Sequence, residues 1–127
     1  NKGSMERDFT YIDDVVNGIL KVSGKPPAPN LNLNTQKTYS PESSELYQIF
    51  NIGNNQPVNL MRFIEIIEAA LGKTAQKNFL PMQPGDVLKT YANIDNLYEA
   101  VGYKPSTTIE VGINNFAKWF LNYYKYR

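Results

Sequence analysis

An arginine just before a short stretch of strand-forming residues is the side chain in this sequence best suited to hold an anion. Arg7 precedes residues 9–11 (FTY), which favour extended backbone, and apolar spacing predicts a helix from Ile12. A guanidinium offers a rigid fork of donors that matches phosphate oxygens, so Arg7 is a candidate anion ligand. The alternative is a solvated surface pair between Arg7 and the adjacent Asp8, which residue types alone favour.

The composition excludes several kinds of site. The 127 residues include no cysteine and no histidine, which rules out disulfides, thiolate nucleophiles, Ser-His-Asp triads and zinc sites built from imidazole or sulfur. The chain has 13 Lys and Arg against 12 Asp and Glu, and no basic run long enough to follow nucleic acid. No apolar run reaches the roughly 20 residues that span a bilayer. We expect one soluble, cytoplasmic region over residues 1–127, with no metal, nucleic acid or membrane partner.

Four helices are predicted to position these residues. The first runs from Ile12 to Gly24, where prolines follow, and Asp13 and Asp14 in its first turn complement the helix dipole. Asn59 is predicted to cap a second helix that ends at Gly72.

The other two helices lie in the C-terminal third. One is predicted over residues 92–101, and the last is predicted to start at Thr107, which forms a capping box with Glu110.

Short strands and loops connect the predicted helices. Alternation and strand-forming residues predict a strand over Leu46–Ile52 with both faces covered, and residues 77–80 (KNFL) predict another. Two prolines and a glycine force a non-helical course over residues 81–87. Residues 25–45 are rich in Pro, Asn, Ser and Thr, so we expect a long flexible loop there.

Three blocks in this order resemble the C-terminal portion of a known family. They are residues 7–19 (RDFTYIDDVVNGI), 47–73 (YQIFNIGNNQPVNLMRFIEIIEAALGK) and 80–124 (LPMQPGDVLKTYANIDNLYEAVGYKPSTTIEVGINNFAKWFLNYY). The pattern is similar to NAD-dependent nucleotide-sugar 4-epimerases of the extended short-chain dehydrogenase/reductase family, of the UDP-glucuronate 4-epimerase type. The resemblance implies an α/β enzyme in which this chain is the small mixed α+β C-terminal substrate-binding region, with four helices and short strands and without the Rossmann domain.

The resemblance also implies a UDP-sugar site. The family arginine that contacts the diphosphate corresponds to Arg7, and the aspartate that accepts hydrogen bonds from the ribose corresponds to Asp86. Gly85 would let the backbone approach the nucleotide. Galactose-type relatives place a phosphate-binding arginine where this chain has Gln83, which can donate a hydrogen bond but carries no charge. Residue types alone favour a different role for Asp86, that of a turn former that caps its own loop.

Two family features are absent from the sequence. It has no G-x-x-G-x-x-G turn for NAD and no Tyr-x-x-x-Lys pair for catalysis. We therefore assign no catalytic or cofactor-binding residue, and we expect a truncated product or fragment that is inactive alone and binds UDP-sugar weakly at best. Glucuronate is the expected sugar, with galactose and N-acetylated sugars as alternatives.

Two other functions stay open. One is a self-associating interaction module derived from an epimerase fragment, and the other is a half that complements a separate NAD-binding chain. In either case, apolar surface that the missing half would cover favours a homodimer or larger assembly through Leu46–Ile52 and Ile12–Val22.

Overall fold

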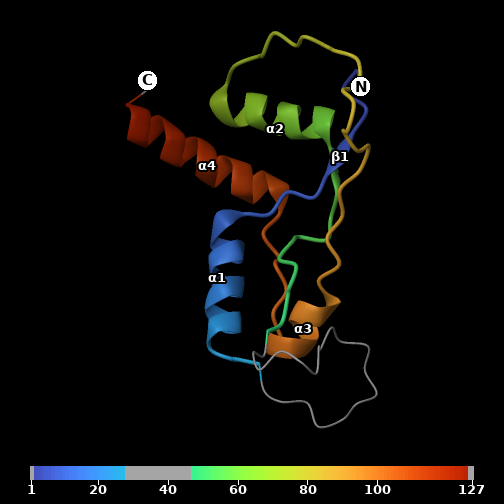
Figure 1. The fold of residues 1–127 in the computed structure, drawn as a ribbon. Coiled ribbons are helices and arrows are strands. Elements are labelled where there is room, and N and C mark those ends of the chain that lie inside the picture. The colour runs from blue at the N-terminus through green and yellow to red at the C-terminus, as the bar shows by residue number, and fades with distance from the viewer. Residues whose placement is uncertain (1, 28–46, 126–127) are drawn as a thin grey trace.

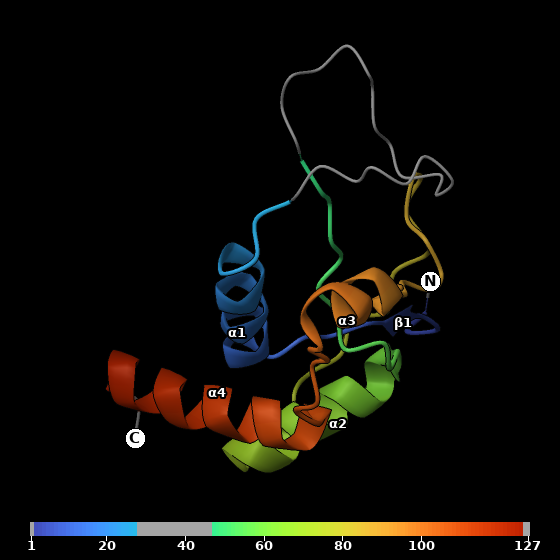
Figure 2. The same cartoon turned by 90° about the horizontal axis from the view of Figure 1, so that it is seen from below.

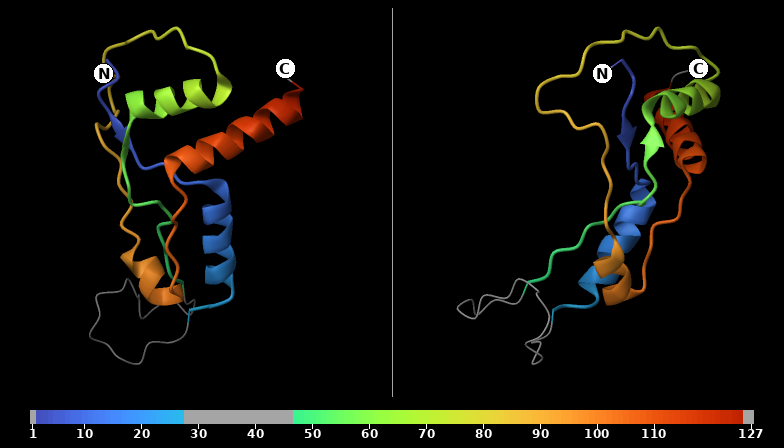
Figure 3. Two further views of the ribbon diagram at one scale, coloured as in Figure 1. Left: turned by 180° about the vertical axis from the view of Figure 1, so that it is seen from behind. Right: turned by 90° about the vertical axis from the view of Figure 1, so that its right-hand side faces the viewer.

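The chain folds as two pairs of packed helices joined by extended segments. The computed structural model describes residues 2–27 and 47–125, and Figure 1 shows the arrangement. The elements in chain order are β1 (Glu6–Arg7), α1 (Ile12–Ser23), β2 (Val58–Asn59), α2 (Leu60–Leu71), α3 (Asp95–Val101) and α4 (Ile109–Tyr124). Helix α2 packs on α4, and α1 packs on α3. The turned view in Figure 2 keeps α2 beside α4, and both views in Figure 3 place α3 away from this pair.

The first two helices form where the sequence predicts them. Helix α1 ends at Ser23 before Gly24. Helix α2 is capped by the Asn59 side chain, whose oxygen accepts a hydrogen bond from the Met61 backbone N–H at 2.8 Å. Gly72 then adopts a left-handed conformation with φ 62°, which ends the helix at little steric cost because glycine has no Cβ.

The last two helices start later than predicted. Helix α3 begins at Asp95 rather than residue 92; its N-cap residue Ile94 makes no side-chain cap, and the Asn93 side chain before it accepts from the Asp95 N–H at 2.9 Å. Helix α4 is capped by Thr108, not Thr107. The Thr107 backbone N–H donates instead to the Asp14 carboxylate at 2.9 Å, so Thr107 belongs to the preceding loop and the predicted capping box with Glu110 is wrong.

The strand predictions are wrong in most places. The described part of the predicted strand, residues 47–52, is irregular, and so are residues 77–80 and 9–11. The observed sheet pairs β1 with β2 in antiparallel register, Glu6 opposite Asn59 and Arg7 opposite Val58. A strand needs a partner for its backbone groups, and residues 47–52 find no strand partner within the described part of the chain. Leu46 and most of the predicted loop, residues 28–45, lie outside the described residues.

Helix α1 presents an unexpected side to its neighbours. Gly18 is buried, and a Cβ added there would lie 3.2 Å from Ile52 Cδ1, so the helix approaches the 51–53 segment closely. The apolar side chains whose spacing predicted this helix are largely exposed, with Ile12 61%, Ile19 53% and Leu20 63% exposed. The buried apolar core of the described residues lies elsewhere, at Ile66, Ile94, Leu97 and Ala117.

Asp14 holds the loop before α4 as well as lying in the first turn of α1. Its carboxylate accepts from the backbone N–H groups of Ser106 at 3.3 Å and Thr107 at 2.9 Å. The Tyr103 hydroxyl donates to the Asp14 carbonyl at 2.9 Å. Burial, followed by the charge of Asp14, raises the pKa of Tyr103 above its usual value. The sequence predicted only the helix-dipole role for this carboxylate.

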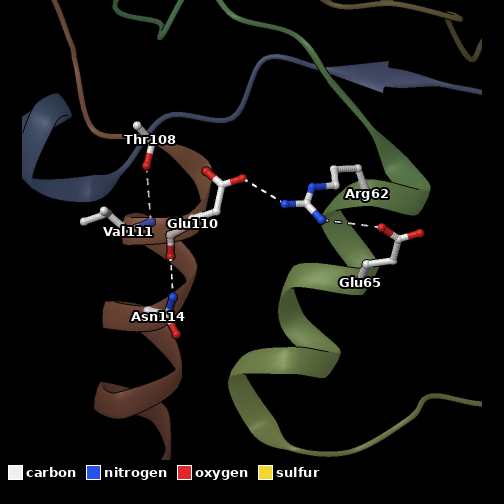
Figure 4. A network of polar contacts seen from close by, with 6 residues as sticks. All are labelled: Arg62, Glu65, Thr108, Glu110, Val111 and Asn114. Carbon is white, nitrogen blue, oxygen red and sulfur yellow. Dashed lines mark hydrogen bonds and ion pairs between the residues drawn. The ribbon is translucent and has the colours of Figure 1, made fainter.

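An exposed network links α2 to α4, as Figure 4 shows. Arg62 lies 3.2 Å from the Glu110 carboxylate and 3.6 Å from that of Glu65. The pKa of Glu110 is held below its usual range, first by a hydrogen bond from the Glu110 backbone N–H to the Glu110 carboxylate and then by the hydrogen bond from Arg62. The side chains are about half exposed, so the network contributes little to stability.

Acidification is expected to remove the stabilisation that Glu68 provides. Its Oε1 accepts from Lys77 Nζ at 2.5 Å and from the Ala75 N–H at 2.7 Å, and these bonds, Lys77 first, lower the pKa of Glu68 below its ordinary value of 4.5. A pKa that is lower in the folded chain gives stability that is present above the ordinary value and lost as the pH falls through the folded one. Thermal melts of Glu68→Gln should show a lower midpoint than wild type at neutral pH, with the two midpoints converging well below pH 4.5.

The control for this pH series is Glu65→Gln on the same helix. Glu65 is 58% exposed and pairs only loosely with Arg62. Its melting midpoint should follow that of wild type at every pH, and a Glu68→Gln deficit that persists in acid would contradict the assignment.

Candidate functional site

The structure brings Arg7 and Asp86 together from opposite parts of the chain. Arg7 Nη2 lies 4.0 Å from Asp86 Oδ1, with the arginine side chain 23% exposed and the aspartate 46% exposed. Arg7 Nη1 also donates to the Glu6 carbonyl at 2.9 Å and reaches that of Leu88 at 3.5 Å. The Arg7 guanidinium is therefore held partly buried at the end of β1, and the more exposed Asp86 carboxylate faces it.

Backbone bonds between β1 and residues 88–90 produce this meeting. The Glu6 N–H donates to the Leu88 carbonyl at 2.9 Å, and the Thr90 N–H donates to the Glu6 carbonyl at 3.2 Å. Glu6 also forms a parallel bridge with Lys89, whose Nζ lies 2.7 Å from the Glu6 carboxylate. Residues 81–87, which precede this segment, are thereby carried to the side chain of Arg7.

The 81–87 loop turns tightly before Asp86. Gly85 has φ 89°, a left-handed conformation that favours glycine, and no atom lies within 4 Å of where its Cβ would be. The Asp86 N–H donates to the Gln83 carbonyl at 3.2 Å, so the turn closes on itself. This geometry leaves the backbone at Gly85 open to an approaching ligand.

Gln83 and Asp86 line one hollow beside α2. It has a volume of about 480 Å³ and is lined also by Met61, Phe79 and Glu68 among others. Arg7 is not among its lining residues. The structure thus joins Asp86 to Arg7 on one side and to Gln83 on the other, while Gln83 and Arg7 do not share a hollow.

Asp8 does not form the surface pair with Arg7 that residue types favoured. Its carboxylate accepts instead from the backbone N–H groups of Asn55, Gln56 and Ala92. The sequence did not predict this role, nor the loop contact of Asp14. The sequence offers one weak signal, which is that Asp8 and Asp14 have no Lys or Arg three or four residues away to pair with. Asp13 has the same feature, so the signal does not single out the two anchoring carboxylates.

Comparison with known proteins places the chain in a family. The model of the family described as GDP-mannose 4,6 dehydratase matches residues 1–116. The chain belongs to this family.

The chain is similar to curated proteins of two bacteria. It is 49% identical over 125 residues to Protein CapI of Staphylococcus aureus and 41% identical over 130 residues to a probable UDP-glucuronate 4-epimerase of Rhizobium meliloti. Each alignment covers 98% of this chain and 37% of the relative. The chain therefore spans about a third of the length of the curated relatives it matches.

A solved structure shows the same fold. The UDP-glucuronic acid 4-epimerase from Bacillus cereus in complex with NAD superposes with a TM-score of 0.70 at 24% identity, over 98% of this chain and 32% of the other. The predicted fold class is confirmed, because the chain is a small mixed α+β unit that matches the C-terminal part of extended short-chain dehydrogenase/reductase epimerases. The resemblance to that family is confirmed with it.

Within the described residues, no helix combines the length and apolar character that crossing a membrane requires.

Proposed function

We propose that this chain is the UDP-sugar-binding part of an NAD-dependent nucleotide-sugar epimerase of the UDP-glucuronate 4-epimerase type. The observation that carries the proposal is the meeting of the Arg7 guanidinium and the Asp86 carboxylate at 4.0 Å, from segments 79 positions apart. A cation and an acceptor side by side suit a ligand that presents phosphates next to hydroxyl groups. The relatives that are named UDP-glucuronate 4-epimerases support glucuronate as the sugar.

Each residue has a distinct part in this proposal. Arg7 offers two donors to the diphosphate and would be drawn from Asp86 by the stronger charge of the ligand. Asp86 accepts hydrogen bonds from the ribose hydroxyls. Gly85 lets the nucleotide lie against open backbone, and Gln83 donates an uncharged hydrogen bond from the neighbouring hollow.

We assign no residue of this chain to NAD. A dinucleotide binds where a glycine-rich turn joins a strand to a helix and frees backbone N–H groups for the pyrophosphate. The β1 to α1 junction carries residues 8–11 (DFTY), and β2 runs directly into α2 at Asn59, so neither junction has a glycine. These residues do not fit the group, and we expect no epimerisation by the chain alone.

A nucleotide titration tests the proposal. Two charged hydrogen bonds contribute roughly 3 to 6 kcal/mol together, which corresponds to a dissociation constant for UDP between about tens of micromolar and several millimolar. In ¹⁵N-resolved NMR spectra, the amides of Arg7 and residues 83–86 should shift on adding UDP or UDP-glucuronate, and much less on adding uridine, which lacks the diphosphate. Spectra unchanged at ten millimolar UDP would overturn the proposal.

The bare face of α1 favours self-association as a second function. Ile12, Val16, Ile19 and Leu20 are each 44% to 63% exposed on one helix. A neighbouring hollow of about 710 Å³, lined by Phe9, Phe63, Phe116 and Trp119 among others, extends the apolar surface. Burying apolar surface of this kind against another copy is favourable, so we propose that the chain forms a homodimer through α1.

Light scattering at tens of micromolar is expected to give twice the chain mass of 14.4 kDa. Leu20→Glu puts a charge into the bare face of α1 and should return the chain to a monomer, because a desolvated charge is costly. The matched control is Asn17→Glu, which adds the same charge at an exposed polar position of α1. A wild-type chain that stays monomeric would exclude this function.

A further inference from the structure

The Asp8 carboxylate ties together two segments that are far apart in the sequence. Its Oδ2 accepts from the backbone N–H groups of Asn55 and Ala92, both at 3.1 Å, and its Oδ1 accepts from that of Gln56 at 3.3 Å. The Asp8 backbone N–H in turn donates to Thr90 Oγ1 at 3.0 Å. A carboxylate that accepts several backbone N–H groups is a strong and directional anchor.

The segment that contains Gly53 passes close to Ala92 and Asp8. A Cβ added to Gly53 would lie 2.3 Å from Ala92 Cβ and 3.0 Å from Asp8 Oδ2. The Gly53 backbone therefore approaches the side chains of Ala92 and Asp8, and the Asp8 carboxylate supplies acceptors for the N–H groups of the two segments.

Backbone pairing alone specifies the register of this region weakly. Strands β1 and β2 pair over two residues each, and the contact between Glu6 and Lys89 is an isolated bridge. Short ladders slip easily, and a slip by one residue turns side chains to the opposite face. A slip of residues 88–92 along β1 would carry Asp86 and its loop away from Arg7.

We propose that Asp8 is a positioning residue that sets the placement of Arg7 relative to Asp86 and thereby the affinity for the nucleotide diphosphate. It follows Arg7 directly in sequence, and it holds residues 90–92, which continue the segment that leads from the Asp86 loop. The inference deepens the proposed function and rests on it.

Asp14 provides a natural control for this role. Its carboxylate also accepts from two backbone N–H groups, those of Ser106 and Thr107, but it holds the loop before α4 instead of the segment that leads from the Asp86 loop. Loss of either carboxylate should loosen the chain, whereas only the loss of Asp8 should disturb the Arg7 site.

The experiment measures UDP affinity by NMR titration in wild type, Asp8→Asn and Asp14→Asn. Asparagine keeps one acceptor oxygen and loses the other with its charge. Asp8→Asn should weaken UDP binding about tenfold or more, approaching the loss caused by removing Arg7 itself. Amide exchange at Asn55 and Ala92 should accelerate in the same variant. Asp14→Asn should bind UDP within about twofold of wild type.

A double-mutant cycle separates positioning from a general loss of stability. If Asp8 acts through Arg7, then Asp8→Asn in the Arg7→Ala background costs less than about twofold in UDP affinity, because the contact it positions is already gone. Should Asp8→Asn fail to fold, Thr90→Val removes only the acceptor for the Asp8 N–H and should show a smaller loss with the same dependence on Arg7.

Each outcome has a definite meaning. Unchanged UDP affinity in Asp8→Asn with faster amide exchange would overturn the positioning role and leave the proposed function intact. Equal losses with and without Arg7 would overturn it as well. A wild-type chain that does not respond to UDP would overturn the proposed function, and the positioning role with it.

Discussion

UDP affinity is expected to fall by about 10- to 100-fold in Arg7→Ala. The guanidinium is partly buried and already oriented by the Glu6 and Leu88 carbonyls, so it is the group best placed to meet a diphosphate. A charged hydrogen bond contributes about 1.5 to 3 kcal/mol, and each 1.4 kcal/mol is tenfold in affinity. Arg7→Lys should recover only part of the loss, because an ammonium cannot form the bidentate contact. Isothermal calorimetry or NMR titration with UDP measures the change.

The matched control for Arg7 is Arg62→Ala. Arg62 is 55% exposed on α2 and pairs with Glu65 and Glu110 instead of the Asp86 loop. Its removal tests whether any arginine of the chain attracts UDP through charge alone. Equal UDP affinity in wild type and Arg7→Ala would remove Arg7 from the site.

The free energy of unfolding is expected to fall by about 2 to 5 kcal/mol in Leu97→Ala. Leu97 on α3 is fully buried, and few large side chains of the described residues share that state. Truncation removes apolar contacts and leaves a cavity between α3 and its neighbours, which a small core cannot fill by shifting. Since marginal stability is typical of a chain this size, denaturant unfolding should show a much lower midpoint or a chain already unfolded.

The same substitution at Leu88 provides the control for Leu97. Leu88 is 59% exposed, and alanine retains its backbone carbonyl, which accepts from the Glu6 N–H. Its unfolding midpoint should stay close to that of wild type. A midpoint for Leu97→Ala that is as high as that of Leu88→Ala would show that the α1 and α3 pair contributes little to stability.

The helices were predictable because their signals are local. Asn59 and Gly72 mark the ends of α2 through side-chain and backbone preferences that act within a few residues. The start of α4 was misplaced by one residue because a distant carboxylate, that of Asp14, binds the Thr107 N–H. Local preference cannot reveal such a competitor.

The strands and the site depend on partners that lie far apart in the sequence. Residues 47–52 have the composition of a strand, but composition does not supply a neighbour for their backbone groups. The resemblance to a family pointed to Arg7 and Asp86 separately, and only the fold shows that they meet. The anchoring role of Asp8 was missed for the same reason, since the N–H groups it binds come from residues 55, 56 and 92.

The arrangement in two helix pairs has a consequence for cooperativity. The α2 and α4 pair and the α1 and α3 pair each bury their own contacts, and they are joined by extended segments rather than by an extensive interface between helices of different pairs. Regions linked in this way open as separate units with different free energies. One helix pair can therefore open transiently while the other stays folded. A protease should then cleave the connecting segments before either pair has fully unfolded.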